Sequence, residues 1–230
     1  MEHPSFSFEQ AAISEYGEAF IIGVDEVGRG PLAGPVVAAA AHCRLESLIA
    51  SGEIPDERFS LIRDSKTLTQ SQREKSLEVI GDCFDTGIGI VEVATIDRIN
   101  ILQATLLAMK NAVYDLMSSI KNEADKEAIP GRRIAVFIDG NREIPGLEQE
   151  FIQKPIVRGD ARSFSVAAAS IVAKVKRDRL MAGLDDVYPG FGFSRHKGYG
   201  TAAHLDAIRR LGITPEHRRS FSPISEYVEK

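Results

Sequence analysis

Two short apolar runs that end in acidic residues constrain this chain more than any other feature. Residues 20–24 (FIIGV) run directly into Asp25 and Glu26, and residues 134–138 (IAVFI) run into Asp139. Apolar runs of this length, bounded by polar residues, are typical of buried strands. A carboxylate directly after a buried strand is costly unless it is paired or bound to a cation. We therefore expect strand ends that carry functional acids.

Strands and helices are mixed along the rest of the sequence. The pattern predicts further strands at 35–41, 88–94 and 155–157, and helices at 70–82, 163–183 and 201–211. Residues 95–120 have the periodicity of one long helix or two, with Thr95 as a candidate N-cap. This order predicts an α/β core around one sheet. No linker divides it, so we expect one domain over residues 20–230, preceded by a short helix or a loose arm within residues 1–19.

The amino-acid composition excludes few classes of protein. Apolar residues make up 43% of the chain and charged residues 27%, which is ordinary for a globular protein. No apolar run approaches the ~20 residues of a membrane span, and the first ten residues lack the pattern of a signal peptide. We therefore expect a cytoplasmic protein that does not enter membranes, with Cys43 and Cys83 as reduced core thiols.

Charge is unevenly distributed along the chain. The net charge is −5, yet residues 154–230 contain 14 Lys and Arg against 8 Asp and Glu. An acidic part that holds metal ions and a basic part that holds phosphates would suit a nuclease, whereas the alternative is that the asymmetry only solvates the surface. Arg177 lies in a basic run that is typical of a solvated helix face, with Lys174 and Asp178 as an ordinary i,i+4 pair. Residues 217–219 (HRR) form a further basic patch.

Four acids are the candidate metal ligands: Asp25, Glu26, Asp139 and Asp160, the last just before the helix predicted at 163–183. Functional groups of open α/β sheets collect outside the carboxyl ends of strands. Carboxylates without a His or Cys cluster favour hard cations such as Mg²⁺ or Mn²⁺, and such sites suit two-metal phosphoryl transfer. The alternative is that these acids are helix caps and salt-bridge partners at the surface.

Asp25 and Glu26 are adjacent, so a regular strand would point them to opposite faces of the sheet. For both to reach one site, the backbone would have to bend at Gly28 or Glu26 would have to approach from the side.

The glycine-rich segment 28–34 (GRGPLAG) is a candidate ligand-binding loop. It superficially resembles a dinucleotide fingerprint, but a proline and a strand follow it where that fingerprint requires a helix. Glycines would instead let the backbone of Gly28, Arg29 and Gly30 approach a sugar hydroxyl closely. The alternative is a turn with only a structural role.

Two other segments offer contacts to a nucleic acid. Asp64, Ser65 and Lys66 place a hydroxyl and a cation at a turn before a helix, either as a phosphate contact or as an N-cap with a solvent-facing lysine. Tyr199 lies between glycines among basic residues. It would either stack on a sugar or base or simply pack within its loop.

The blocks that contain these residues resemble the ribonuclease HII family of bacteria. They are residues 23–37 (GVDEVGRGPLAGPVV), 64–66 (DSK), 138–141 (IDGN), 159–160 (GD), 168–178 (AASIVAKVKRD) and 196–201 (HKGYGT). They occur in the order of the family and cover about residues 20–223. The first block is highly specific, and the six blocks together argue against chance similarity.

The resemblance implies a ribonuclease H-like fold: a five-stranded mixed sheet flanked by helices, with a helical C-terminal part that binds substrate. It implies an endonuclease that cuts RNA in RNA–DNA hybrids and 5′ to a single ribonucleotide in duplex DNA, leaving 5′-phosphate and 3′-hydroxyl ends. It implies Asp25, Glu26, Asp139 and Asp160 as ligands of Mg²⁺ or Mn²⁺, with Gly28, Arg29 and Gly30 at the ribose 2′-hydroxyl and Tyr199 at the RNA–DNA junction. We expect nucleic acid as the partner and a monomer as the oligomeric state.

The chain departs from the family pattern in two ways. Residues 46–60 and 121–133 look like surface insertions. Asp160 is followed by Ala161 and Arg162, whereas the family block begins Gly-Asp-Ser. About 19 residues precede the first predicted strand, so we do not expect the large N-terminal domain of the related HIII type.

Two other function classes fit parts of this pattern. One is a binding module that keeps the fold without catalysis, but a binder of polyanions has no use for four acids. The other is a different nuclease or a strand-transfer enzyme, which would also use clustered acids. Only the Gly28–Gly30 segment and Tyr199 distinguish the last class from a ribonuclease.

Overall fold

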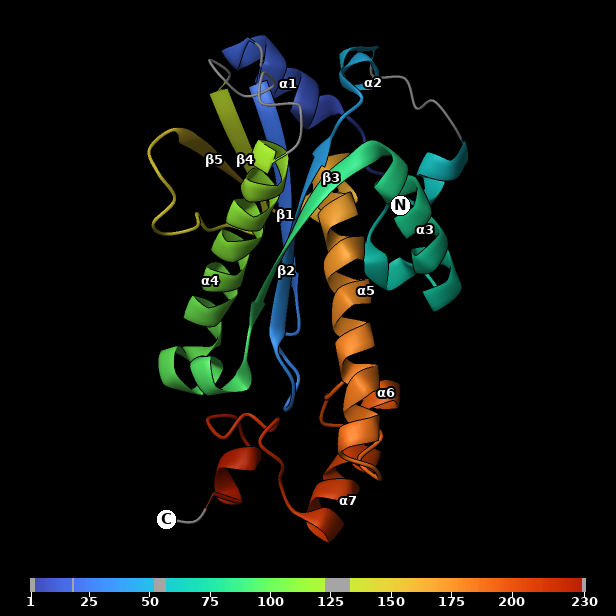
Figure 1. The fold of residues 1–230 in the computed structure, drawn as a ribbon, viewed down its shortest axis with the longest axis vertical. Helices are drawn as coiled ribbons and strands as arrows, with labels where there is room; N and C mark the ends of the chain where they lie inside the picture. The colour runs from blue at the N-terminus through green and yellow to red at the C-terminus, as the bar shows by residue number, and fades with distance from the viewer. Residues whose placement is uncertain (1–2, 18, 52–56, 123–132, 229–230) are drawn as a thin grey trace.

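A five-stranded mixed sheet forms the centre of the protein (Figure 1). The computed structural model describes residues 3–17, 19–51, 57–122 and 133–228. The strands lie in the order β3-β2-β1-β4-β5, with antiparallel pairs β1–β2 and β2–β3 and parallel pairs β1–β4 and β4–β5. Their bounds are Ala19–Val27 (β1), Val36–Cys43 (β2), Phe84–Val91 (β3), Arg133–Asp139 (β4) and Phe151–Ile156 (β5). The predicted α/β fold with a five-stranded mixed sheet is confirmed.

Helices cover the sheet and extend beyond one of its ends. Figure 1 shows α4 and α5 along the sheet, with α6, α7 and the C-terminal segment gathered at one end of the molecule. The helices are Ser7–Tyr16 (α1), Glu46–Ser51 (α2), Gln70–Cys83 (α3), Val93–Asn122 (α4), Phe164–Val187 (α5), Phe193–His196 (α6) and Ala202–Leu211 (α7). Short 3₁₀ turns lie at Glu57–Leu61 (η1), Ser65–Thr67 (η2), Gly159–Ala161 (η3) and Ile224–Glu226 (η4).

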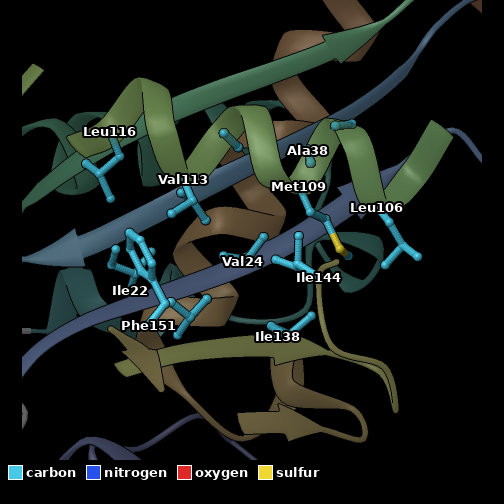
Figure 2. Close-up of a cluster of buried hydrophobic side chains, with 14 of the residues drawn as sticks. Ile22, Val24, Ala38, Leu106, Met109, Val113, Leu116, Ile138, Ile144 and Phe151 are labelled. Atoms are coloured by element: carbon cyan, nitrogen blue, oxygen red, sulfur yellow. The ribbon is translucent and has the colours of Figure 1, made fainter. Parts of the chain in front are cut away.

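Strand β1 sorts its side chains between the two layers of helices. Ile22 and Val24 belong to the cluster that packs against α4 (Figure 2), whereas Ile21 packs with Val166 of α5. This alternation follows from the two-residue period of a strand. The neighbouring strand β2 contributes small side chains, Ala38–Ala41, to both clusters. It therefore lets a helix approach each face of the sheet closely.

Helix α4 consists of two helices that meet at a kink. Asn100 has φ 67° and ψ 164°, which is not a helical conformation. Its side-chain oxygen accepts from the amides of Leu102 and Gln103, as an N-cap does for the second helix. The sequence pattern was compatible with one long helix or with two, and the structure has two.

The predicted start of this region is wrong by a few residues. Strand β3 ends at Val91 and helix α4 begins at Val93, so Thr95 lies in the first turn and is not the N-cap. The amide of Thr95 donates instead to the carbonyl of Glu92. The apolar run across the strand–helix boundary hid this turn, because Val91 and Val93 keep the strand alternation.

The N-terminal stretch forms helix α1, one of its two predicted states. Phe6 and Ala12 are buried, and Glu9 accepts from Ser163 and from the amide of Ser165 at the start of α5. The division into an arm and a domain at residue 20 stays a prediction. So does the assignment of insertions, since residues 52–56 and 123–132 lie outside the described part of the chain. Cys43 and Cys83 are buried, as predicted. No helix among the described residues is both long and apolar enough for a membrane span.

Candidate active site

Three of the four candidate acids lie at the carboxyl ends of the neighbouring strands β1 and β4, and the fourth lies nearby in the chain segment after β5. Strands β1 and β4 are parallel neighbours with Val24 opposite Ile138, so Asp25 and Asp139 end up side by side. Asp160 lies in η3, between β5 and α5. The amide of Gly159 donates to Asp139 Oδ1 over 2.7 Å, which holds the turn that carries Asp160 against the end of β4.

Asp25 and Glu26 do point to opposite faces of the sheet. Asp25 is 4% exposed and its carboxylate is hydrogen-bonded to Ser170 of α5. Glu26 instead lines a pocket of about 80 Å³ on the α4 side, together with Asp139. The carboxylates therefore approach one another around the end of the sheet rather than across one face.

Burial and mutual repulsion perturb these acids. Burial raises the pKa of Asp25 well above its ordinary value, and the charges of Glu26 and Asp139 raise it further. Burial also raises the pKa of Glu26, although Arg29 opposes the shift. The pKa of Asp160 is raised by burial and by Asp139. Such mutual destabilisation of like charges is characteristic of a site that binds a cation.

Two cations of the chain partly offset this negative charge. Arg29 Nη1 lies 3.2 Å from Glu26 Oε1, and Lys66 Nζ lies 3.6 Å from Asp160 Oδ2. Burial acts to lower the pKa of Lys66, but Asp160 and Asp25 outweigh it and raise the pKa. Within the described residues, no group of three or more His, Cys, Asp or Glu side chains lies close enough together to hold a metal ion as it stands. The four acids offer only oxygen donors, which is the donor type that a hard divalent cation prefers.

The two segments that are candidates for substrate recognition, the loop 28–34 and the segment around Tyr199, meet beside the acids. Gly28 has φ +98°, one of the two possibilities that the sequence left open, and carries the chain from β1 into the loop 28–34. A Cβ on Gly30 would lie 3.6 Å from Cε1 of Tyr199, and the amide of Leu32 donates to the carbonyl of Gly198 over 2.8 Å. The Tyr199 side chain is 47% exposed. Arg29, Gly30 and Tyr199 are exposed and therefore form one surface next to Glu26, whereas Gly28 is buried.

Ser65 and Lys66 differ in what they offer. The Lys66 side chain is 76% exposed beside Asp160. Ser65 is buried, with its hydroxyl 3.0 Å from that of Ser170. Asp64 accepts from the amide of Lys66 and caps η2, as one of the alternatives predicted. A phosphate contact by either residue stays a prediction.

Two arginines that the sequence assigned to basic surfaces are in fact fully buried. Arg177 and Arg218 are each 0% exposed and lie beneath the loop 28–34. The predictions of a solvated helix face and a surface patch are wrong for these residues, because main-chain carbonyls distant in sequence bind them. The predicted pair of Lys174 and Asp178 is confirmed at 2.6 Å. Arg142, which lines the Glu26 pocket, was missed, and its only signal was its place three residues after Asp139.

A chain of histidines supports the Tyr199 loop from below. The amide of Thr214 donates to His217 Nδ1, so the proton of that neutral ring is on Nε2. His217 Nε2 lies 3.1 Å from His204 Nε2, and His204 Nδ1 lies 2.9 Å from the Tyr199 carbonyl. His204 therefore donates to Tyr199. Burial lowers the pKa of both rings to about 4, which keeps them neutral.

Comparisons with known proteins agree with this geometry. The family model described as Ribonuclease HII matches residues 22–224. A "Ribonuclease HII" of Paramagnetospirillum magneticum is 46% identical over 209 residues, covering 90% of this chain and 92% of that protein. Among solved structures, the ribonuclease H2 of Pyrococcus horikoshii OT3 is similar with a TM-score of 0.64 and 26% identity, covering 90% of this chain and 96% of that one.

A second solved structure shares the fold at lower identity. Bst-RNase HIII in complex with Mn²⁺ matches with a TM-score of 0.65 and 19% identity, covering 94% of this chain and 71% of that one. The family match and the identity to curated relatives decide the classification. The chain belongs to the ribonuclease HII family and is an endonuclease that hydrolyses the RNA strand of RNA–DNA hybrids.

Proposed function

We propose that this enzyme also cuts 5′ to a single ribonucleotide embedded in duplex DNA, by divalent-metal catalysis that leaves 5′-phosphate and 3′-hydroxyl ends. One observation carries the proposal: a row of four acids lies beside a glycine loop that contacts an exposed tyrosine. A site for a lone ribonucleotide has to recognise one 2′-hydroxyl and the deoxyribose that follows it. The adjoining Gly30 and Tyr199 suit these two tasks.

Asp25, Glu26, Asp139 and Asp160 would hold the metal, which is Mg²⁺ or Mn²⁺. Their oxygen-only donors, their raised pKa values and the Mn²⁺ complex of Bst-RNase HIII support this choice. Bound there, divalent ions would activate the attacking water and stabilise charge on the phosphate and the leaving 3′ oxygen.

The residues of the chain would bind and orient the substrate. The backbone of Gly28, Arg29 and Gly30 reads the 2′-hydroxyl, because glycines allow the main chain to approach a ribose. Lys66, exposed beside Asp160, would contact a phosphate of the substrate. The Tyr199 ring would stack on the sugar at the junction.

A cleavage assay tests the proposal directly. The substrates are an RNA–DNA hybrid, a DNA duplex with one ribonucleotide and an all-DNA duplex, each with Mg²⁺, Mn²⁺ or EDTA. We expect a single cut 5′ to the ribonucleotide, with metal only, and products that a DNA polymerase extends from the 3′ end. Cleavage in EDTA, or cleavage of the hybrid without cleavage at the lone ribonucleotide, would contradict the proposal.

Tyr199→Ala tests the junction role. We expect the rate at a lone ribonucleotide to fall roughly tenfold or more, as for loss of one stacking contact, and the rate within a long hybrid to fall less. Tyr227→Ala removes another exposed tyrosine and should leave both rates unchanged. Equal losses of Tyr199→Ala on every substrate would argue against junction reading.

A further inference from the structure

Two buried arginines bind the loop 28–34 through its main chain. Arg177 comes from α5 and Arg218 from the segment after α7, and both are fully buried. The hydrogen bonds described for the two guanidiniums all go to main-chain carbonyls. A buried guanidinium is costly unless its donors are satisfied, so these contacts fix both the side chains and the carbonyls.

Arg218 joins the two ends of the loop. Its Nε donates to the carbonyl of Gly34 over 3.0 Å and its Nη1 to that of Arg29 over 2.9 Å. Its Nη2 donates to the carbonyls of Gly28 and Gly34. One guanidinium therefore orients the peptide groups that follow Gly28 and Arg29.

Arg177 connects the loop to the segment that carries Tyr199. Its Nε donates to the carbonyl of Pro35 over 3.0 Å and its Nη2 to that of Ala33 over 3.1 Å. Its Nη1 donates to the carbonyl of Lys197 over 2.9 Å. The two segments are also in direct van der Waals contact, since a Cβ on Gly198 would lie 2.4 Å from the Ala33 carbonyl oxygen.

The direction of these carbonyls determines where the loop amides point. In a trans peptide the C=O and the following N–H point in opposite directions. Arg218 draws the carbonyls of Gly28 and Arg29 inward. The amides of Arg29 and Gly30 therefore point away from the buried guanidinium of Arg218.

We propose that Arg177 and Arg218 are positioning residues for cleavage: Arg218 turns the amides of Arg29 and Gly30 toward the ribose, and Arg177 fixes their position relative to Tyr199. This inference rests on the proposed role of the loop as the ribose reader. Arginine is required because one planar fork spans three carbonyls, which the single ammonium of lysine cannot do. Charge alone does not supply this function.

Arg218→Lys and Arg218→Met test the inference, with Arg44→Met as a matched control. Arg44 also donates to two main-chain carbonyls, those of Gly81 and Asp82, but it follows β2 at the far end of that strand from the loop. Lysine keeps the charge, but its three N–H donors all lie on one nitrogen atom and cannot reproduce the arginine fork. Arg218→Lys therefore tests the inference even if Arg218→Met does not fold. Thermal unfolding establishes that each variant is folded.

Three measurements are made on each folded variant. Hydrogen exchange reports on the peptides that contain residues 28–34 and 197–200. Steady-state kinetics gives kcat and KM on a duplex with one ribonucleotide. Fluorescence anisotropy in EDTA gives the ratio of affinities for that duplex and for the all-DNA duplex, which a merely less stable protein would not change.

For Arg218→Lys we expect faster exchange in residues 28–34, a fall of about tenfold in kcat/KM, and an affinity ratio reduced by a similar factor. Arg44→Met should change none of the three. Unchanged exchange and kinetics in Arg218→Lys would overturn the inference, since charge would then suffice. Faster exchange with unchanged kinetics and affinity ratio would instead overturn the loop as ribose reader, and so the proposed function on which the inference rests.

Discussion

The acid cluster and the arginine-bound loop lie next to each other, but they differ in how their buried charges are stabilised. At the sheet edge, Asp25, Glu26 and Asp160 have raised pKa values because burial and like charges destabilise their ionised forms. Beneath the loop, burial lowers the pKa of Arg177 to about 10 and that of Arg218 to about 9. Both arginines thus stay charged at neutral pH, and carbonyl dipoles satisfy them.

This difference indicates that the acids serve to bind a ligand, whereas the arginines serve to preorganise the loop. The buried and mutually repelling acids lower the stability of the protein, and a bound cation can relieve this cost. The stability of the protein is therefore coupled to cation binding. The arginines have their partners within the chain, so they fix a geometry before substrate arrives. We therefore expect substitutions of the acids to abolish activity and to stabilise the protein, and substitutions around the loop to reduce both activity and stability.

The largest expected effect is that of Asp25→Asn. Cleavage should fall at least about a hundredfold, because a charge that acts on the transition state is lost. The unfolding temperature in EDTA should rise, because the like-charge repulsion at Asp25 is removed, and the further rise on adding Mn²⁺ should shrink. Asp186→Asn, on the exposed side of α5, is the control and should change neither quantity. A lower unfolding temperature for Asp25→Asn would break the comparison.

Gly28→Ala should have the next largest effect. A Cβ there would lie 2.3 Å from Arg177 Nε, and φ is +98°, so strain and overpacking should lower the free energy of unfolding by about 2–4 kcal/mol. Cleavage should fall as well, since the loop and its arginine shift together. Gly183→Ala in α5 meets nothing within 4 Å and should stabilise by up to about 1 kcal/mol. Urea denaturation measures both, and equal effects would contradict a tightly packed loop.

The last expected effect is on the pH dependence of stability and not on cleavage. His204 and His217 have pKa values lowered to about 4, so between pH 6.5 and 4 the unfolded chain binds protons that the folded chain does not. Stability conferred by each neutral ring should therefore fall by roughly 1.4 kcal/mol per pH unit as the pH decreases through this range. The carboxylates with raised pKa act in the opposite direction, so the variant has to be compared with the parent.

His204→Gln isolates this contribution, because glutamine still donates to the Tyr199 carbonyl but does not titrate. Urea denaturation at several pH values should give a smaller loss for the variant than for the parent below pH 6.5. Parallel curves for the two proteins would show that the ring is not held neutral.

The sequence predicted that three acids lie at strand ends for a physical reason, whereas their role as metal ligands stays a prediction. Asp25, Glu26 and Asp139 stand out because each costs free energy at the end of an apolar run, and this cost is visible locally. The sheet was equally accessible, since strand periodicity is a local signal. Boundaries such as that between Val91 and Val93 could not be predicted from the sequence, because the apolar alternation continues through the turn.

Arg177 and Arg218 could not be recognised in this way. Their partners lie 142 and 184 residues away along the chain, at Pro35 and Gly34. Carbonyls have no side-chain identity, so no residue type in the loop marks them as acceptors. A basic residue is ordinarily solvated, and only the assembled fold shows that these two are not.

The long separation between the loop and its arginines has a consequence for synthesis. Residues 28–34 leave the ribosome well before Arg177 and Arg218 are translated, and domains fold as their elements become available. The nascent sheet can pair β1 with β2 while the loop carbonyls still face water. Final ordering of the loop therefore waits for residue 218, and a chain that stops just short of it would leave the carbonyls of Gly28, Arg29 and Gly34 without this partner.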